Sequence, residues 1–284
     1  MISSNPEIYI VKVPELPEVE TTLRGIQPHV LNKKISSVVV RQSSLRWPVP
    51  EKLIQKKLLS NVFSNITRRG KYLLLQSSKE YLIIHLGMSG SLRIANSDDL
   101  KKHDHIDISF EDGTILRYCD PRRFGCFLWT KDIQTHFLLK DLGPEPLGNY
   151  FNGEYLFHLS RNRKVPIKNF IMNSKVVVGV GNIYASEALF ASKIRPSSKA
   201  GRVPKKKYET LASEIIKLLR KSIDQGGTTL RDFVSGNNEP GYFKQSLMVY
   251  GREGEICYDC STTIKGQRIG QRASAFCPKC QSNF

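Results

Sequence analysis

Four of the six cysteines stand as two close pairs near the end of the chain, a spacing typical of a metal site. Two residues separate Cys257 from Cys260 and Cys277 from Cys280, and sixteen residues between the pairs leave room for a β-hairpin. Two such knuckles can place four thiolates tetrahedrally around one Zn²⁺. Because all four ligands are protein thiolates, no coordination position stays open, and the predicted zinc is structural. Free thiols or an iron site are the alternatives.

The string Pro14-Glu15-Leu16-Pro17-Glu18-Val19-Glu20 is a second group that could do chemistry. Pro17 suits a first helical turn, and the helix dipole stabilises negative charge there. The three carboxylates are therefore compatible with an ordinary acidic helix start as well as with acid–base catalysis. Taken alone, the string does not decide between them.

The composition limits the partners of these groups. The 284 residues carry 43 Lys+Arg against 26 Asp+Glu, a formal net charge of +17, which attracts nucleic acid or an anionic membrane. No apolar run approaches the roughly 18 residues of a membrane span, and residues 1–13 lack the basic start of a signal peptide. We therefore predict a cytoplasmic protein with no membrane partner.

The elements that position these groups fall into two regions. A helix is predicted over residues 14–30, and residues 35–130 read mostly as strands of an antiparallel sandwich or barrel, with an Asp-Gly hairpin turn at 110–114. A turn-rich stretch at 142–148 marks a hinge. Helices are then expected over four segments, 152–160, 166–173, 183–191 and 205–225.

The predicted fold class is α+β with two domains. An N-terminal antiparallel β-sandwich with flanking helices spans 14–130, and a hinge spans 131–150. A helical domain over 151–243 then leads into a four-cysteine zinc finger over 244–284, expected as a β-hairpin.

Several motifs together resemble one family, the bacterial formamidopyrimidine-DNA glycosylases, also called 8-oxoguanine DNA glycosylase/AP lyases. The resemblance covers residues 14–281 in order and rests on the 14–20 string, the cysteine pairs and three further segments, 85–90 (HLGMSG), 120–125 (DPRRFG) and 178–187 (VGVGNIYASE). Leu16 and the segment 225–230 favour this branch over the related endonuclease VIII branch, which prefers oxidised pyrimidines. The resemblance implies a helix–two-turn–helix in the helical domain and a base-excision repair enzyme that removes oxidised purines from double-stranded DNA as a monomer.

The resemblance also implies the catalytic groups. Pro14 matches the family's nucleophile, whose free secondary amine attacks the sugar C1′ and forms a Schiff base that permits β,δ-elimination at the abasic site. Glu15 matches the general acid/base, and Glu18 matches a supporting carboxylate. Lys71 matches a sandwich-loop lysine that binds the lesion's phosphate or assists at the damaged base. Arg272 matches the zinc-hairpin arginine that binds phosphates beside the lesion.

The other implied residues bind and distort DNA. Asn182 matches the helix–two-turn–helix asparagine that holds a phosphate, and His85 and Tyr242 are further phosphate contacts. Met88, Arg122 and Phe124 match the triad that fills the gap left by a flipped base. The loop at 228–243 matches the segment that covers that base.

The sequence departs from the family at its beginning. Thirteen residues precede Pro14, so in the chain as written its nitrogen is a tertiary amide that cannot form a Schiff base. A GTG codon encodes valine inside a chain, but in bacteria it can also start translation with methionine. We therefore hypothesise that Val13 is the true start and that residues 1–13 are an atypical extension. A processed leader and an extension that silences or repurposes the enzyme are the alternatives.

The sequence leaves two alternative functions. A non-catalytic lesion-binding or DNA-binding protein fits if Pro14 stays blocked. An RNA-associated zinc-ribbon protein explains the charge and the cysteines, but not the 14–20 string or the wedge residues. The roles of Cys119 and Cys126 are not assigned.

Overall fold

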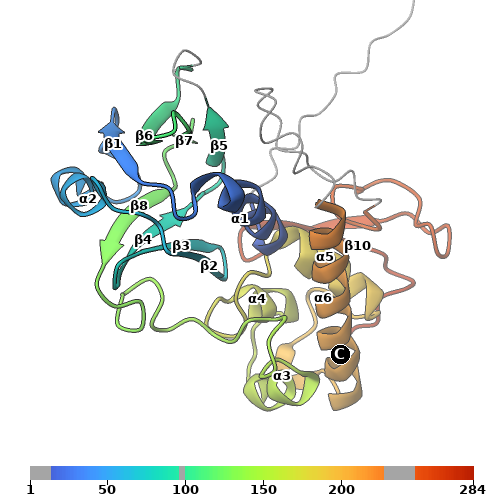
Figure 1. Ribbon diagram of the computed structural model, residues 1–284. Coiled ribbons are helices and arrows are strands. Elements are labelled where there is room, and N and C mark those ends of the chain that lie inside the picture. The colour runs from blue at the N-terminus through green and yellow to red at the C-terminus, as the bar shows by residue number, and fades with distance from the viewer. Residues whose placement is uncertain (1–13, 96–99, 227–246) are drawn as a thin grey trace, which may run out of the picture.

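The computed structural model describes residues 14–95, 100–226 and 247–284, and it confirms the α+β class. Two four-stranded antiparallel sheets form the N-terminal half, helices dominate the C-terminal half, and helix α1 (Leu16–Val30) lies between them (Figure 1). The helix predicted over 14–30 therefore forms. No helix of the described residues is long and apolar enough to span a membrane.

The sandwich is built from eight strands. One sheet has the order β1-β6-β7-β5 and the other β2-β3-β4-β8. Their bounds are β1 (Ile35–Val40), β2 (Asn65–Arg69), β3 (Tyr72–Ser77), β4 (Glu80–His85), β5 (Ser91–Ala95), β6 (Asp104–Phe110), β7 (Ile115–Cys119) and β8 (Cys126–Thr130). The predicted Asp-Gly turn joins β6 to β7, and apolar side chains of both sheets form one core.

One feature of the sandwich differs from the predicted run of strands, and a second is a buried charge. Helix α2 (Glu51–Leu58) interrupts the run of strands and buries Ile54 and Leu58. Asp107 lies between the buried residues Ile106 and Ile108 on β6, a position that strand alternation would expose. It is nevertheless buried, because the guanidinium groups of Arg117 and Arg41 pair with its carboxylate. An ion-paired carboxylate can occupy a position that alternation would assign to solvent.

The helical half has its own core. Its helices are α3 (Gly153–Ser160), α4 (Ile167–Met172), α5 (Asn182–Ala191) and the long α6 (Lys205–Gly226), close to the four predicted segments, with a short 3₁₀ turn at Ala200–Arg202. Strands β9 (Lys265–Ile269) and β10 (Arg272–Phe276) form the hairpin between the cysteine pairs, and β10 packs on α5.

Helix α1 joins the two halves. Its residue Leu16 belongs to the helical core, whereas Val19, Leu23 and Ile26 belong to the sandwich core. The apolar stripe at helical spacing is therefore shared between two cores. The first residues of α1, where the sequence places its carboxylates, lie at the junction.

Candidate active site at the domain junction

The carboxylate of Glu15 is the centre of the junction. It is 2% exposed and accepts hydrogen bonds from the backbone N–H groups of Gly181 (2.8 Å), Ile183 (2.9 Å) and Tyr184 (3.4 Å) at the start of α5. The helix N-terminus offers unpaired N–H groups and a positive dipole end to this anion. A side chain at Gly181 would overlap the carboxylate, so this close approach requires glycine. Pro14, also buried, directly precedes it.

Burial acts against the charge of Glu15. Desolvation raises its pKa above the ordinary value of 4.5, and the Glu18 carboxylate adds to this, while Lys71 and the α5 N–H groups act in the opposite direction. Glu18 in turn accepts the backbone N–H of Glu15 (2.9 Å) and the hydroxyl of Tyr184 (2.9 Å). A carboxyl group held beside Pro14 with a raised pKa is suited to donating a proton.

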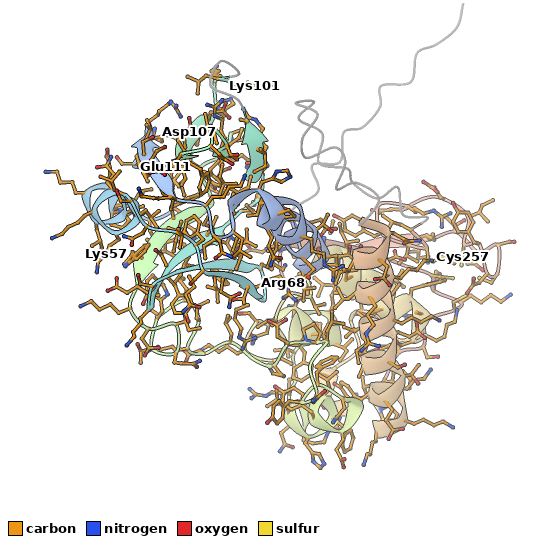
Figure 2. The ribbon with its side chains drawn as sticks, viewed as in Figure 1. Lys57, Arg68, Lys101, Asp107, Glu111 and Cys257 are labelled. Atoms are coloured by element: carbon orange, nitrogen blue, oxygen red, sulfur yellow. The ribbon has the colours of Figure 1, made fainter. Side chains whose placement is uncertain are left out.

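Lys71 reaches the same place from the sandwich. It lies in the tight turn between β2 and β3, within electrostatic reach of Glu15 and His85. The turn is tied to the interdomain segment by Glu145, which accepts from the backbone N–H of Gly70 (2.6 Å) and pairs with Arg68 (2.8 Å). Arg68 also pairs with Glu20 of α1, and Figure 2 shows it at the junction.

Lys168 lies at the site, although the sequence did not predict it as a site residue. This α4 side chain is 0% exposed, and its ammonium donates to the carbonyl of Ala273 (3.2 Å) and the hydroxyl of Ser274 (2.7 Å) in β10. Desolvation lowers its pKa to about 8; the nearby Glu15 raises it and Arg272 lowers it further. A lysine in a short helix looks solvated in a sequence, and no local signal distinguishes this one.

The four-cysteine hairpin brings Arg272 to the site. Arg272 begins β10 and is exposed, and the amide of Asn182 donates to the carbonyl of the next residue, Ala273 (3.2 Å). Asn182, the first residue of α5, and Arg272 therefore lie close to each other and to Lys168. The structure thus brings together residues of the 14–20 string, the glycine-rich segment and the hairpin.

His85 ends β4 next to this cluster. Its ring packs against Tyr72 with 4.7 Å between centroids, and its Nδ1 accepts the backbone N–H of Gly87 (2.9 Å). Desolvation, then the positive charges of Lys71 and Arg46, lower its pKa to about 4. The imidazole is therefore neutral at pH 7 and can donate one hydrogen bond to an anion through Nε2.

The three predicted wedge residues lie on two adjacent loops. Met88 is half-buried in the turn after β4, whereas Arg122 and Phe124 lie between β7 and β8, where Phe124 is 45% exposed. The Arg122 guanidinium stacks over the Phe124 ring, 4.9 Å from its centroid. An exposed aromatic ring capped by a cation is available for contact with another molecule. Tyr242 and the loop at 228–243 lie outside the described residues.

The four cysteines of the two pairs lie close enough together to hold a metal ion. The sulfur atoms of Cys257, Cys260, Cys277 and Cys280 all lie within 4.8 Å of one another. Figure 2 marks Cys257 in the hairpin region, beyond α5 and α6. Four converging thiols in partly buried positions are a metal-binding set. Cys119 and Cys126 stand apart from it in the sandwich.

The carboxylate of Glu15 is buried beside Pro14, and lysines from both halves of the chain lie near it. This arrangement is that of a two-domain protein with its reactive groups at the domain junction. Comparison with sequence profiles identifies the family. The formamidopyrimidine-DNA glycosylase N-terminal domain matches residues 13–127, and the H2TH domain of the same glycosylase matches residues 142–234. The chain belongs to the formamidopyrimidine-DNA glycosylase family.

Individual relatives agree with this. The chain is 53% identical over 270 residues to the formamidopyrimidine-DNA glycosylase of Stutzerimonas stutzeri, covering 95% of this chain and all of that one, and 54% identical to that of Pseudomonas entomophila over the same length. The Lactococcus lactis enzyme bound to abasic-site DNA superposes with a TM-score of 0.83 at 31% identity, and its complex with FAPY-dG DNA with 0.84 at 32%. Each of these structures covers 95% of this chain and is itself covered fully.

Proposed function

We propose that this protein is a base-excision repair DNA glycosylase that removes oxidised purines and then cleaves the abasic site. The observation that carries the proposal is the buried, N–H-bound carboxyl of Glu15 directly after Pro14, at the meeting point of two domains. Related structures contain DNA with an abasic site, FAPY-dG or carbocyclic 8-oxo-G, which supports oxidised purines as the substrate class.

In the proposed reaction, the Pro14 nitrogen acts as a free secondary amine. It forms a bond to the sugar C1′ while the bond from C1′ to the damaged base breaks, and the departing base takes up the proton that the amine nitrogen loses. The ring oxygen takes a proton from Glu15 as the sugar opens to an iminium ion. The iminium withdraws electrons from C2′, whose proton is then removed, and the 3′ and 5′ phosphates leave in two eliminations. Hydrolysis of the remaining bond frees Pro14.

The raised pKa of Glu15 supports its role as the proton donor. An acid whose pKa is raised toward the working pH keeps a larger protonated fraction for the transfer. The excision rate should therefore fall as pH rises through the raised pKa of this carboxyl. Glu18, hydrogen-bonded to the Glu15 N–H and to Tyr184, is proposed to hold the start of α1 in place.

Two cations and two neutral hydrogen-bond donors around the junction are proposed to hold the DNA backbone. Lys71 and Arg272 supply the positive charge, the neutral imidazole of His85 and the amide of Asn182 supply further donors, and the net charge of +17 supports a polyanionic partner. Neutralising several phosphates releases counterions, so affinity should fall steeply between low and moderate salt. Met88, Arg122 and Phe124 are proposed to fill the stack when the damaged base turns out, with Arg122 facing the orphaned base.

The metal is proposed to be one Zn²⁺. Tetrahedral Zn–S bonds of about 2.3 Å place the sulfurs about 3.8 Å apart. The sulfurs of Cys257 and Cys280 are 3.9 Å apart, and those of Cys260 and Cys277 are 3.4 Å apart. The ion would fix the hairpin that carries Arg272 and supply no open coordination site for catalysis.

The nucleophile is tested by borohydride trapping on a duplex with 8-oxoguanine opposite cytosine. In the printed sequence Val13 acylates Pro14, so the 284-residue chain is compared with a form that begins at Pro14, and the cross-linked residue is mapped by mass spectrometry. Trapping of the shorter form alone, at Pro14, is the expected result.

Two other outcomes would change the proposal. Equal trapping of both forms at another amine, such as Lys71, would show that Pro14 is not the nucleophile. Binding of the duplex by both forms with no trapping and no base release would favour the second candidate, a lesion-binding protein without catalysis, which the amide at Pro14 supports for the chain as written.

A further inference from the structure

A fully buried carboxylate, Asp120, lies between the two loops that carry the wedge residues. It is 0% exposed, at the end of β7, and has no part in the proposed chemistry. Met88 comes from the loop at 86–90, while Arg122 and Phe124 come from the loop at 121–125. The two loops are separated by three strands in sequence, so contacts between them must fix their relative position.

Each oxygen of Asp120 accepts hydrogen bonds from these loops. Oδ1 accepts the hydroxyl of Ser89 (2.7 Å), the neighbour of Met88, and the backbone N–H of Arg122 (3.3 Å). Oδ2 accepts the backbone N–H of Gly125 (2.8 Å), which follows Phe124, and the hydroxyl of Tyr118 (3.0 Å). One carboxylate therefore bonds to a residue adjacent to Met88 and to both ends of the segment that presents Arg122 and Phe124.

The two loops also pack so closely that glycine is required at two positions. A side chain at Gly125 would overlap the Tyr118 hydroxyl, and one at Gly87 would lie 2.5 Å from the backbone carbon of Phe124. Ser89 strengthens the link, because its hydroxyl accepts the Arg122 N–H (3.1 Å) while donating to Asp120. The contact between the loops is thus polar and depends on charge-assisted hydrogen bonds, which are stronger than neutral ones.

We propose that Asp120 is a positioning residue that holds Met88, Arg122 and Phe124 as one preassembled wedge before DNA binds. The proposal rests on the proposed function only in taking these three residues as the wedge. A side chain that must enter a base stack loses less conformational freedom when its loop is already fixed. Asp120 acts through Ser89 and the loop backbone, and it does not touch DNA itself.

The Asp120→Asn variant tests this with little change of shape. An amide has one acceptor oxygen and one NH₂ donor group. If the NH₂ group of the new asparagine takes the place of Oδ2, it faces the backbone N–H of Gly125. If the NH₂ group takes the place of Oδ1, it faces the backbone N–H of Arg122. In either orientation two donors face each other without an acceptor, which loosens the loop at 121–125.

The readout is insertion of the wedge, measured without catalysis. The probe is a duplex with a tetrahydrofuran abasic analogue opposite 2-aminopurine, whose fluorescence rises when it is unstacked. It is used at protein saturation with the full 284-residue chain. The matched control is Asp107→Asn, which removes another buried carboxylate of the same sandwich, on β6, where it pairs with Arg41 and Arg117 and not with either loop (Figure 2). Thermal unfolding of both variants is recorded.

The expected result is that Asp120→Asn loses most of the fluorescence increase while Asp107→Asn keeps it, whatever their melting temperatures. Single-turnover release of 8-oxoguanine from duplex by the active form should fall on the order of tenfold to a hundredfold, as for a displaced positioning group. Elimination at a preformed abasic site in single-stranded DNA, which has no stack to fill, should change less than about twofold by the same reasoning.

Other results would overturn the inference. These are an unchanged fluorescence increase in Asp120→Asn, an equal loss in Asp107→Asn, or equal losses in base release and elimination. If Asp120→Asn does not fold, Ser89→Ala replaces it, since that change cuts only the tie to the Met88 loop, and full fluorescence there would refute the proposal. If the form that begins at Pro14 unstacks the probe but releases no base, the proposed function is refuted and this inference stands.

Discussion

Replacing Lys168 by methionine should flatten the pH dependence of folding stability above neutral pH. Lys168 is fully buried, and desolvation lowers its pKa from 10.5 to about 8. Below pH 8 the amine is protonated in the folded and the unfolded chain, and burying its charge destabilises the fold in full. Between pH 8 and 10.5 the unfolded chain binds more protons than the folded one, so this lysine's contribution to stability rises with pH.

The size of the effect follows from the two pKa values. The gap between 10.5 and about 8 corresponds to about 3 kcal/mol, since one pKa unit is worth about 1.4 kcal/mol. Raising the pH from about 7 to about 9.5 recovers about 2 kcal/mol of this, because the folded amine has then lost its proton while most unfolded chains keep theirs. The free energy of unfolding of the Lys168→Met variant has no such increase with pH. Losing the hydrogen bonds from Lys168 to Ala273 and Ser274 lowers that free energy at every pH.

The assay is urea unfolding of wild type and Lys168→Met at several pH values with metal concentration held constant. The free energy of unfolding of the wild type minus that of the variant should increase by about 2 kcal/mol from pH 7 to pH 9.5. Lys206→Met, which removes an exposed lysine of α6, should show no such trend. A difference that stays constant with pH for Lys168→Met would refute the reasoning, because it would mean that the folded amine titrates like the unfolded one.

Three further predictions concern the carboxylate, the isolated thiols and the metal. Gly181→Ala should displace the Glu15 carboxyl that lies against it and slow 8-oxoguanine release on the order of a hundredfold in single-turnover assays; an unchanged rate would contradict the tight fit. Burial raises the pKa of Cys119 to about 11 and of Cys126 to about 12, so native protein near neutral pH should leave both unlabelled by iodoacetamide and label them in urea, as judged by peptide mass. Chelation should release one metal ion per chain, measured by atomic emission, and weaken duplex binding as the Arg272 hairpin loosens; metal loss with full affinity would show that the hairpin holds without it.

The sequence predicted those parts of the fold whose signal is local. Val19, Leu23 and Ile26 repeat at helical spacing and form the stripe of α1, and the Asp-Gly pair at 112–113 turns β6 into β7. The cysteine spacing predicted the hairpin, because a short segment between two ligand pairs leaves the chain few paths. Helix α2 was missed since its eight residues bury only two apolar side chains, too few for a clear period.

The site could be predicted only as far as motifs extend. Glu15 belongs to a recognisable string, but its partners on α5 are more than 160 residues away, and nothing near Glu15 indicates that its carboxyl is buried. Lys168 and Asp120 carry charges that a sequence places in solvent, yet both are fully buried. Lys168 donates to Ser274, more than 100 residues away, and Asp120 accepts from Ser89, 31 residues away. Such residues are determined by tertiary contacts, which periodicity and spacing do not encode.

The location of the site explains why it needs both domains. Leu16 packs in the helical core and Val19 in the sandwich core, so the start of α1 is fixed only when both cores form. Glu15 then takes its N–H donors from α5, while Lys71 approaches from a sandwich turn whose backbone is tied to Glu145 of the interdomain segment. A change in the angle between the domains would therefore separate Lys71 from Glu15 before it disturbed either core. The ion pairs of Arg68 with Glu20 and Glu145 oppose that change, since they connect α1, the turn and the interdomain segment through one guanidinium whose side chain is only 10% exposed.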